Sequence, residues 1–445
     1  MLRTFANIFR VPDLRKKVLV TLALIVVFRL GSYVPLPGVN TAAVAQVADK
    51  MREGGRGNVA GRALGLIDLF TGGALGRCAV FGLGIMPYIS ASIIFQLLAT
   101  VIKPLEELQR EGEAGRKKIN QYTRYATVAL AIIQSSTIAI YLENQPATQY
   151  GTIVMQSGFF FRMLTIITLT AGTILAMWLG EQITDRGIGN GISFLIFVGC
   201  LDDTPSSIGR VIGMVRSGET SWLALVLLAA LIFAVYAGVV LLTMAVLKIP
   251  VVYQGRVVGR QMYREHRTHL PIRVWTAGVI PIIFAQSLVV FPSTFAQFIK
   301  APWLQSMQST LSAGGWLYDL LYAILIVFFT YFYTSVVFNA RDIADNLRKY
   351  GGAVPGKQAG DKTAEHIDRS LSLITLPGAI TLVVIALLPG FLMNSLRVPF
   401  YFGGTTLMII VGVALDTLQQ IEAHLVMRHY EGLVKGGRFQ GRRFG

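Results

Sequence analysis

Residues 351–357 come nearest to a catalytic motif, because they read G-x-x-x-x-G-K. A phosphate-binding loop uses this spacing to surround phosphates with backbone N–H groups and a lysine, and its next residue is a Ser or Thr that binds Mg²⁺. Here Gln358 occupies that position, and no apolar strand precedes the glycines. We therefore predict that this stretch binds no nucleotide.

Glycines also alternate at Gly187, Gly189 and Gly191, a spacing related to that of dinucleotide sites. They follow a long apolar segment and the charged pair Asp185 and Arg186, which favours a tight turn between two membrane helices. None of the five histidines has metal-ligand spacing, and the two cysteines form no CxxC motif. The sequence thus predicts that the protein is not an enzyme and has no metal and no cofactor.

Polar side chains inside apolar segments are better candidates for function, because each is costly to place in hydrocarbon. Asp416 lies near the middle of such a segment, but no second carboxylate is predicted at that depth. This pattern argues against a proton- or sodium-coupled carrier. Arg29 lies near the end of the first apolar segment, where its guanidinium either has a function or extends outward to the interface.

The elements that must position these residues are membrane helices. The chain has 445 residues, of which 53% are hydrophobic and 14% are charged, and its mean hydropathy is +0.57. A water-soluble chain of this length would not carry this composition. Because no polar stretch is long enough for a separate core, we expect one polytopic membrane domain of the all-α class.

A membrane span needs roughly 20 mostly apolar residues. Reading between charge clusters and Pro or Gly breaks predicts ten transmembrane helices. They cover residues 18–35, 79–102, 125–142, 159–180, 188–201, 222–247, 271–291, 316–338, 371–393 and 402–426.

Charge sets the orientation of these spans. With the N-terminus inside, the inner segments hold 28 of the 40 Lys and Arg residues, which predicts that both termini are cytoplasmic. Five spans then lie on either side of residues 202–221, so we expect an N-terminal half (1–201) and a C-terminal half (202–445) of opposite orientation. This is the layout of an inverted repeat, argued from topology alone.

The outer segment between the first two spans contains a short apolar stretch, residues 64–76, with four glycines. It is too short to cross a bilayer. One interpretation is a re-entrant helix that folds back into the protein, where its backbone is sheltered from lipid. The other is an amphipathic helix on the membrane surface.

Two long peptides carry a family resemblance, GIMPYISASII at 84–94 and GEQITDRGIGNG at 180–191. Both resemble peptides of the SecY family, the main subunits of bacterial protein-conducting channels. Shorter matches at 29–31, 35–38, 268–271, 279–281, 345–347 and 354–356 extend the resemblance over essentially the whole chain.

The resemblance implies a narrow ring of apolar side chains at mid-membrane. Such a ring closes around an extended peptide without binding it, and it gates ions by dewetting when it is empty. The matching positions are all isoleucine: Ile85, Ile89, Ile192, Ile196, Ile283 and Ile409.

The resemblance also implies a plug and a lateral gate. The plug corresponds to residues 64–76, with the apolar side chains Leu64, Ile67, Leu69, Phe70 and Leu75. The gate lies between the second and seventh spans, with Ser90, Gln96 and Phe291 at its seam. Polar residues there make the stability of the gate depend on what fills it, so that a signal sequence can shift it open.

The cytoplasmic loops 248–270 and 339–370 match the family's docking arms for the ribosome and the motor ATPase SecA. The residues implied are Arg256, Arg260, Arg264, Lys357 and Gln358. Family members usually carry Arg where this chain has Gln358, which puts the detail of motor docking in doubt. The alternative for the loop arginines is a plain positive-inside role without a partner.

By resemblance, the chain is a gated channel in the bacterial plasma membrane. It would translocate unfolded secretory proteins and release transmembrane segments laterally into lipid. Its implied partners are the small subunits SecE and SecG, SecA, the ribosome, signal sequences, nascent or unfolded chains, and lipid. The alternative is a secondary transporter of small solutes built on an inverted repeat.

Overall fold

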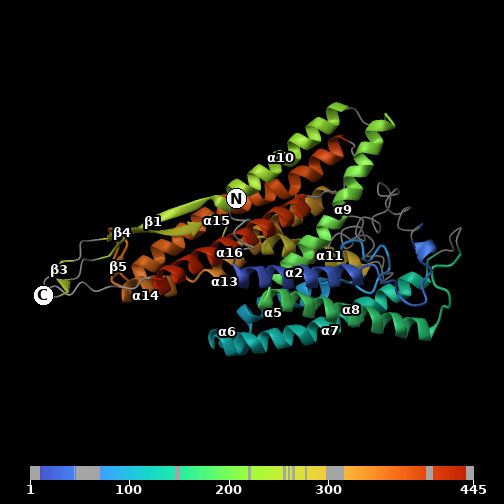
Figure 1. Cartoon of the computed structure of the whole chain (residues 1–445), viewed down its shortest axis with the longest axis horizontal. Helices are drawn as coiled ribbons and strands as arrows, with labels where there is room; N and C mark the ends of the chain where they lie inside the picture. Colours follow the sequence, from blue (N-terminus) through green and yellow to red (C-terminus); the bar gives the residue numbers. More distant parts are fainter. Residues whose placement is uncertain are drawn as a thin grey trace. The chain divides into compact units, whose positions relative to one another are not determined.

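The computed structural model describes residues 11–44, 46, 71–145, 151–218, 222–253, 257–258, 261–262, 266–275, 278–296, 315–396 and 404–436. The chain divides into two compact units. The first contains residues 1–54, 67–203 and 413–445, and the second contains residues 55–66 and 204–412. Most of the described residues are helical (Figure 1).

The first unit is built from helices. They are α2 (Pro12–Gly31), α5 (Met86–Val101), α6 (Lys103–Arg110), α7 (Glu113–Glu143) and α8 (Phe159–Arg186), with the start of α9 (Gly191–Arg216) and the end of α16 (Gly404–Gly436). A proline in the first turn of α2, α5 and α6 fixes where each begins, because proline lacks the N–H that a helix start leaves unbonded. α8 packs against α7 and α2, and α5 packs against α7.

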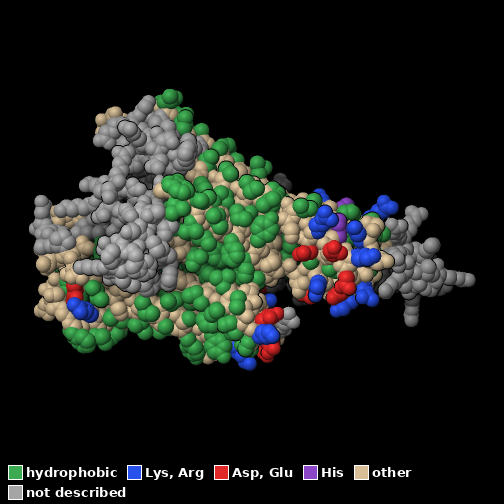
Figure 2. All heavy atoms as spheres, turned by 180° about the vertical axis from the view of Figure 1, so that it is seen from behind, with side chains coloured by type: hydrophobic (Ala, Val, Ile, Leu, Met, Phe, Trp, Pro, Cys, Tyr) green, Lys and Arg blue, Asp and Glu red, His purple; other side chains and the backbone are tan. Residues whose placement is uncertain are grey.

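The sequence of α7 shows how these helices pack. Its buried positions recur at intervals of four residues and carry small or hydroxyl side chains, including Thr123, Thr127, Ala131, Ser135 and Ala139. Helices in lipid approach closely through such stripes, because apolar bulk gives no advantage over lipid there. Several large side chains of α7, such as Ile132, Ile133 and Ile140, are exposed instead, and hydrophobic side chains cover much of the face shown in Figure 2.

The second unit combines helices with a small sheet. Its helices are α10 (Trp222–Met244), α11 (Ile280–Ala296), α13 (Trp316–Val337), α14 (Ala340–Lys349) and α15 (Asp361–Leu396). α13 packs against α11 and α15, and α10 also packs against α15.

The sheet corrects the all-α prediction, since the chain is mainly rather than purely helical. β1 (Val246–Tyr253) pairs antiparallel with β4 (His266–Arg273) on one edge and with β5 (Gly352–Ala353) on the other. A second, two-stranded sheet joins β2 (Val257–Val258) to β3 (Gln261–Met262). The prediction missed β1 because it ended the span at residue 247 and placed residues 248–253 in a loop; Lys248 and Pro250 interrupt this short apolar run, so it carries no clear strand pattern.

Each predicted span overlaps one helix, with shifted ends. Among the described residues, five helices are long and apolar enough to cross a membrane by themselves: Glu113–Glu143, Phe159–Arg186, Trp316–Lys349, Asp361–Leu388 and Thr406–Met427. A sixth candidate combines α5 and α6, which meet at an angle of 103°. The protein is thus a multi-pass membrane protein, and the count of ten spans, the two halves and their orientation stay predictions.

Candidate functional site

In the turn between α8 and α9, backbone N–H groups donate hydrogen bonds to three side chains, which fixes the start of α9. Asn190 Oδ1 accepts from the N–H groups of Ile192 and Ser193 at 3.1 and 3.4 Å, as an N-capping residue does. Thr184 Oγ1 accepts from the Gly191 N–H at 2.9 Å. From α2, Thr21 Oγ1 accepts from the Ile188 N–H at 3.2 Å. The glycine-rich motif is therefore a helix-to-helix turn, as predicted.

α8 and α9 approach each other through glycine. A Cβ atom on Gly191 would overlap the carbonyl oxygen of Gly180 and lie 2.7 Å from the Cβ of Ile183. A side chain on Gly191 would therefore force the two helices apart. The close approach therefore fixes the position of the first turn of α9 relative to α8.

Two of the predicted ring residues come together at this contact. A Cβ atom on Gly180 would lie 3.3 Å from Ile192 Cγ1 and 3.4 Å from Ile85 Cδ1, so both isoleucines reach the same point of α8. Ile85 is the residue directly before α5, Ile89 lies one turn later, and both are buried. Ile196, one turn after Ile192 on α9, is also buried.

The other two ring residues belong to the second unit. Ile283 lies in the first turn of α11 and Ile409 in α16, and both are buried. The structure thus brings Ile85 and Ile192 together within one unit, and the closed ring of six stays a prediction.

The predicted gate residues are also divided between the units. Ser90 and Gln96 lie on α5, where Gln96 Nε2 donates to Ser92 Oγ at 3.1 Å. The Oε1 atom of Gln96 is buried without a hydrogen-bond partner among the described residues. Phe291 lies in α11, and its side chain is outside the described part of the structure. The pairing of these residues across a gate stays a prediction.

Of the predicted plug residues, only Leu75 lies within the described structure, whereas Leu64, Ile67, Leu69 and Phe70 lie outside it. From residue 72 to residue 85 the chain runs through successive turns up to the start of α5. Gly72, Gly73 and Gly84 have positive φ angles there, as does Cys78 at 47°. Glycine adopts such angles without steric cost, which explains its repeated use in this segment.

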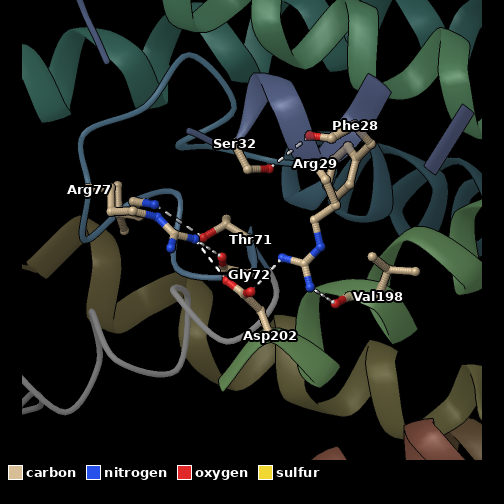
Figure 3. A network of polar contacts seen from close by, with 9 residues as sticks. Phe28, Arg29, Ser32, Thr71, Gly72, Arg77, Val198 and Asp202 are labelled. Atoms are coloured by element: carbon tan, nitrogen blue, oxygen red, sulfur yellow. Dashed lines mark hydrogen bonds and ion pairs between the residues drawn. The ribbon is translucent and has the colours of Figure 1, made fainter. Parts of the chain in front are cut away.

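A charge cluster that the sequence analysis missed lies beside this segment (Figure 3). The carboxylate of Asp202 on α9 forms ion pairs with Arg29 Nη1 at 3.0 Å and with Arg77 Nη2 at 2.8 Å. Arg29 Nη2 also donates to the carbonyl of Val198 at 2.8 Å. Arg29 is therefore paired within the protein and does not simply extend to the interface. The available signal was that Arg29 and Asp202 both occupy the ends of apolar segments, where an opposite charge reduces the cost of each.

Only two of the five predicted docking residues lie within the described structure. Arg256, Arg260 and Arg264 lie outside the described residues, whereas Lys357 and Gln358 are exposed. The near-match to a phosphate loop contains β5, which pairs with β1, so its glycines serve a strand and turns. One apolar cluster of the second unit draws residues from both predicted loops: Ile249, Ile272, Ala340, Val354, Ile367 and Leu371.

Comparison with known proteins gives a consistent result. A family model described as SecY matches residues 79–418. The protein translocase subunit SecY of Escherichia coli (strain K12) is 44% identical over 433 residues, which cover 96% of each chain. The same subunit of Aquifex aeolicus (strain VF5) is 42% identical over 429 residues, 96% of this chain and 98% of that one.

Solved structures show the same fold at low sequence identity. The structure titled "The structure of a protein conducting channel" has a TM-score of 0.65 at 16% identity and covers 95% of both chains. A structure of Sec61 in the canine ribosome-channel complex has a TM-score of 0.62 at 15% identity, again with 95% coverage of both chains.

Proposed function

The chain belongs to the SecY family, and on that premise we propose that it is a gated protein-conducting channel. It translocates unfolded secretory proteins across the membrane and releases transmembrane segments laterally into lipid. The observation that carries this conclusion is 44% identity to a protein translocase subunit over 96% of the chain. The family is one of channel subunits, so the activity is translocation and not catalysis.

The pore constriction is formed by Ile85, Ile89, Ile192, Ile196, Ile283 and Ile409. In support, all six positions lie within the stretch that matches the family model. Ile85 and Ile192 both reach Gly180, although 106 residues separate them in sequence. Branched apolar side chains offer a passing chain no hydrogen bonds, so a polar polypeptide slides past without being held.

The gate opens between α5 and α11, and residues 64–76 form the plug. The Oε1 atom of Gln96 is buried and has no hydrogen-bond partner among the described residues. This supports the role for α5, because such an atom costs free energy unless a donor reaches it. A donor brought by a client or by α11 would lower that cost. One structural neighbour is titled for the plug domain of SecY, which that title says stabilises the closed state.

The two cytoplasmic loops form one docking platform for the ribosome and the motor SecA, and SecE and SecG complete the complex. β5 of the second loop extends the sheet of the first, and both loops share an apolar core, so a partner that binds one loop pushes on the other. Contacts of the loop arginines to ribosomal RNA are directed to phosphates and weaken with salt. Both termini and both loops lie on the cytoplasmic side of the bacterial plasma membrane.

The experiment that tests the pore uses single cysteines at Ile85, Ile192, Ile283 and Ile409, with Cys78 and Cys200 replaced by Ser. A stalled secretory chain that carries one cysteine is oxidised against each variant in membranes. Disulfide adducts are expected at all four positions. Exposed positions on the same four helices serve as controls, namely Ile94, Leu201, Leu288 and Val426. Adducts at the controls but at none of the ring positions would exclude the channel and favour a transporter of small solutes.

A further inference from the structure

Asp202 accepts two guanidinium groups at once, and nothing in the proposed translocation path accounts for this cluster. Its carboxylate oxygens lie 3.0 Å from Arg29 Nη1 and 2.8 Å from Arg77 Nη2. The side chains are 24% (Arg29), 18% (Asp202) and 35% (Arg77) exposed, so all three are partly dehydrated. Asp202 therefore joins three segments that are remote in sequence: α2, α9 and the residues that precede α5.

Arg77 is also held by its own segment. Its Nη2 atom donates to the carbonyl of Gly72, and its guanidinium carbon lies 4.3 Å from the centre of the Tyr33 ring, a cation–π contact. Bonds to backbone, aromatic ring and carboxylate together fix one position of the side chain. The turn at residues 72–77 is thus closed on itself and tied to α9 by the same guanidinium.

The glycines of this segment lie directly on α9. A Cβ atom on Gly72 would lie 3.0 Å from the Cα of Gly199 and 3.3 Å from Arg29 Nη1. A Cβ atom on Gly73 would lie 2.9 Å from Arg77 Nη2. The backbone therefore approaches the helix as closely as it can, which brings Arg77 within reach of Asp202.

The one carboxylate and the two guanidinium groups do not contribute equally to this contact. With Asp202 ionised, the cluster carries one net positive charge. Without the carboxylate, two guanidinium groups would face each other across a partly dehydrated space, and like charges there repel strongly. Loss of Asp202 should therefore release the segment more completely than loss of either arginine. Because every member is partly exposed, water can replace the broken bonds, so that release is reversible.

We propose that Asp202 is the catch that holds residues 71–78 against α9, and that breaking its ion pairs frees this segment. The proposal rests on the proposed function in one respect, namely that residues 71–76 of this segment are the end of the plug. Asp202 is then a positioning residue for the closed state, which acts through Arg77 and does not touch the translocating chain.

Cys78 provides a native reporter, because it directly follows Arg77 and only 8% of it is exposed. In a Cys200→Ser background it is the sole thiol of this chain. The full protein in membranes is treated with a small thiol-alkylating reagent, and the rate of Cys78 labelling is measured. Asp202→Asn should raise the rate roughly tenfold, between the effects of breaking a surface and a buried ion pair. Arg77→Gln and Arg29→Gln should raise it less, and Asp202→Glu should keep it near the starting value.

Glu181→Gln is the matched control. It breaks the 2.8 Å ion pair of Glu181 with Arg124, which joins α7 to α8 in the same unit, and it should leave Cys78 labelling unchanged. A labelling rate for Asp202→Asn within twofold of the starting value would overturn the proposal. So would equal increases in Asp202→Asn and Glu181→Gln, because they would indicate general loosening of the unit.

Export of a client with a weakened signal sequence, measured in the same membranes, separates the catch from the channel. A gain of export in Asp202→Asn together with faster labelling supports the catch as part of the closed state. If the channel function itself were wrong, no variant would export the client, and the labelling rates would still decide whether the catch exists.

Discussion

At the residue scale, the contact of α8 with α9 depends on two glycines, because a residue without a side chain lets the backbones approach closely. Gly180 and Gly191 bring the two backbones together, and Ile85 and Ile192 fill the space beside them. Such a contact places α9 more firmly than an ion pair would, because overlap of closely packed atoms cannot be relieved by water. Single substitutions here should therefore affect both stability and transport.

Gly191→Ala should be severely damaging, because the new methyl group would overlap the Gly180 carbonyl oxygen. We expect a loss of about 3 kcal/mol in the free energy of unfolding, the upper range for overpacking. The measurement is denaturant unfolding in detergent, paired with an export assay. Gly209→Ala on the same helix is the control, since a Cβ atom there meets nothing within 4 Å and alanine favours helix. Equal stability of both variants would contradict the close approach.

Thr21→Val should destabilise the first unit, because Thr21 Oγ1 accepts from the buried N–H of Ile188. Valine keeps the shape and leaves that donor unpaired, at a cost of about 1–3 kcal/mol. Thr21→Ser should restore most of the stability, since it returns the oxygen atom. Thr381→Val is the control, because Thr381 is only partly buried and, like Thr21, donates to the carbonyl four residues earlier on its own helix. Thermal unfolding in detergent distinguishes the three variants.

At the element scale, the three-stranded sheet joins the two predicted loops, because β5 of the second pairs with β1 of the first. β5 contributes only two residues, Gly352 and Ala353, which pair with Tyr253 and Val252 of β1. Beneath them, Ile249 and Val354 belong to the same apolar core. A strand this short is stable only when it packs on an apolar core. Loss of the pairing between β5 and β1 should therefore also loosen the packing of the core beneath them.

Gly352→Val should part the two loops. A Cβ atom at this position would lie 2.9 Å from Tyr253 Cε1 and 3.3 Å from Val251 Cγ1, and a branched side chain would push the Tyr253 ring away. We expect faster hydrogen exchange at residues 252–253 and 352–353, with exchange in the membrane helices unchanged. Lys357→Ala, which removes an exposed side chain from the same loop, is the control. Unchanged exchange in Gly352→Val would show that the pairing does not hold the loops together.

At the scale of the whole molecule, each compact unit carries part of the predicted pore. Ile85 and Ile192 belong to one unit, and Ile283 and Ile409 belong to the other. The proposed ring of six isoleucines therefore draws residues from both units, and that they line one constriction stays a prediction.

A disulfide between Ile85→Cys and Ile283→Cys tests that statement. If both positions lie in one closed ring, oxidation in membranes should join them, since a disulfide needs Cβ atoms about 4 Å apart. Export should stop on oxidation and return on reduction. The exposed pair Ile94→Cys with Leu288→Cys, on the same two helices, should neither join nor block export. Failure of the first pair to join in an export-competent channel would rule out a ring containing both residues.

The sequence by itself determined the membrane class, the approximate place of the long apolar helices and the family, but not the short helices α6 and α14, which lie in predicted loops. These properties depend on local composition and on unbroken peptides: an apolar run of sufficient length is helical in lipid because its backbone bonds must close internally. The turn at Gly187–Gly191 could be predicted for the same reason, from residues adjacent in the chain. The helix ends were predicted less well. The second span was predicted to begin at residue 79, whereas α5 begins at residue 86, with a proline in its first turn.

Only the tertiary structure decided which distant residues meet. Asp202 pairs with Arg29 and Arg77, 173 and 125 residues earlier, and no local pattern selects that partner among the charges of the chain. β5 is a strand only because β1 lies beside it, and Gly180 matters only because Ile85, Ile192 and Gly191 approach it from other segments. Contacts of this kind depend on the packing of whole helices, which is a property of the folded chain and not of any stretch of its sequence.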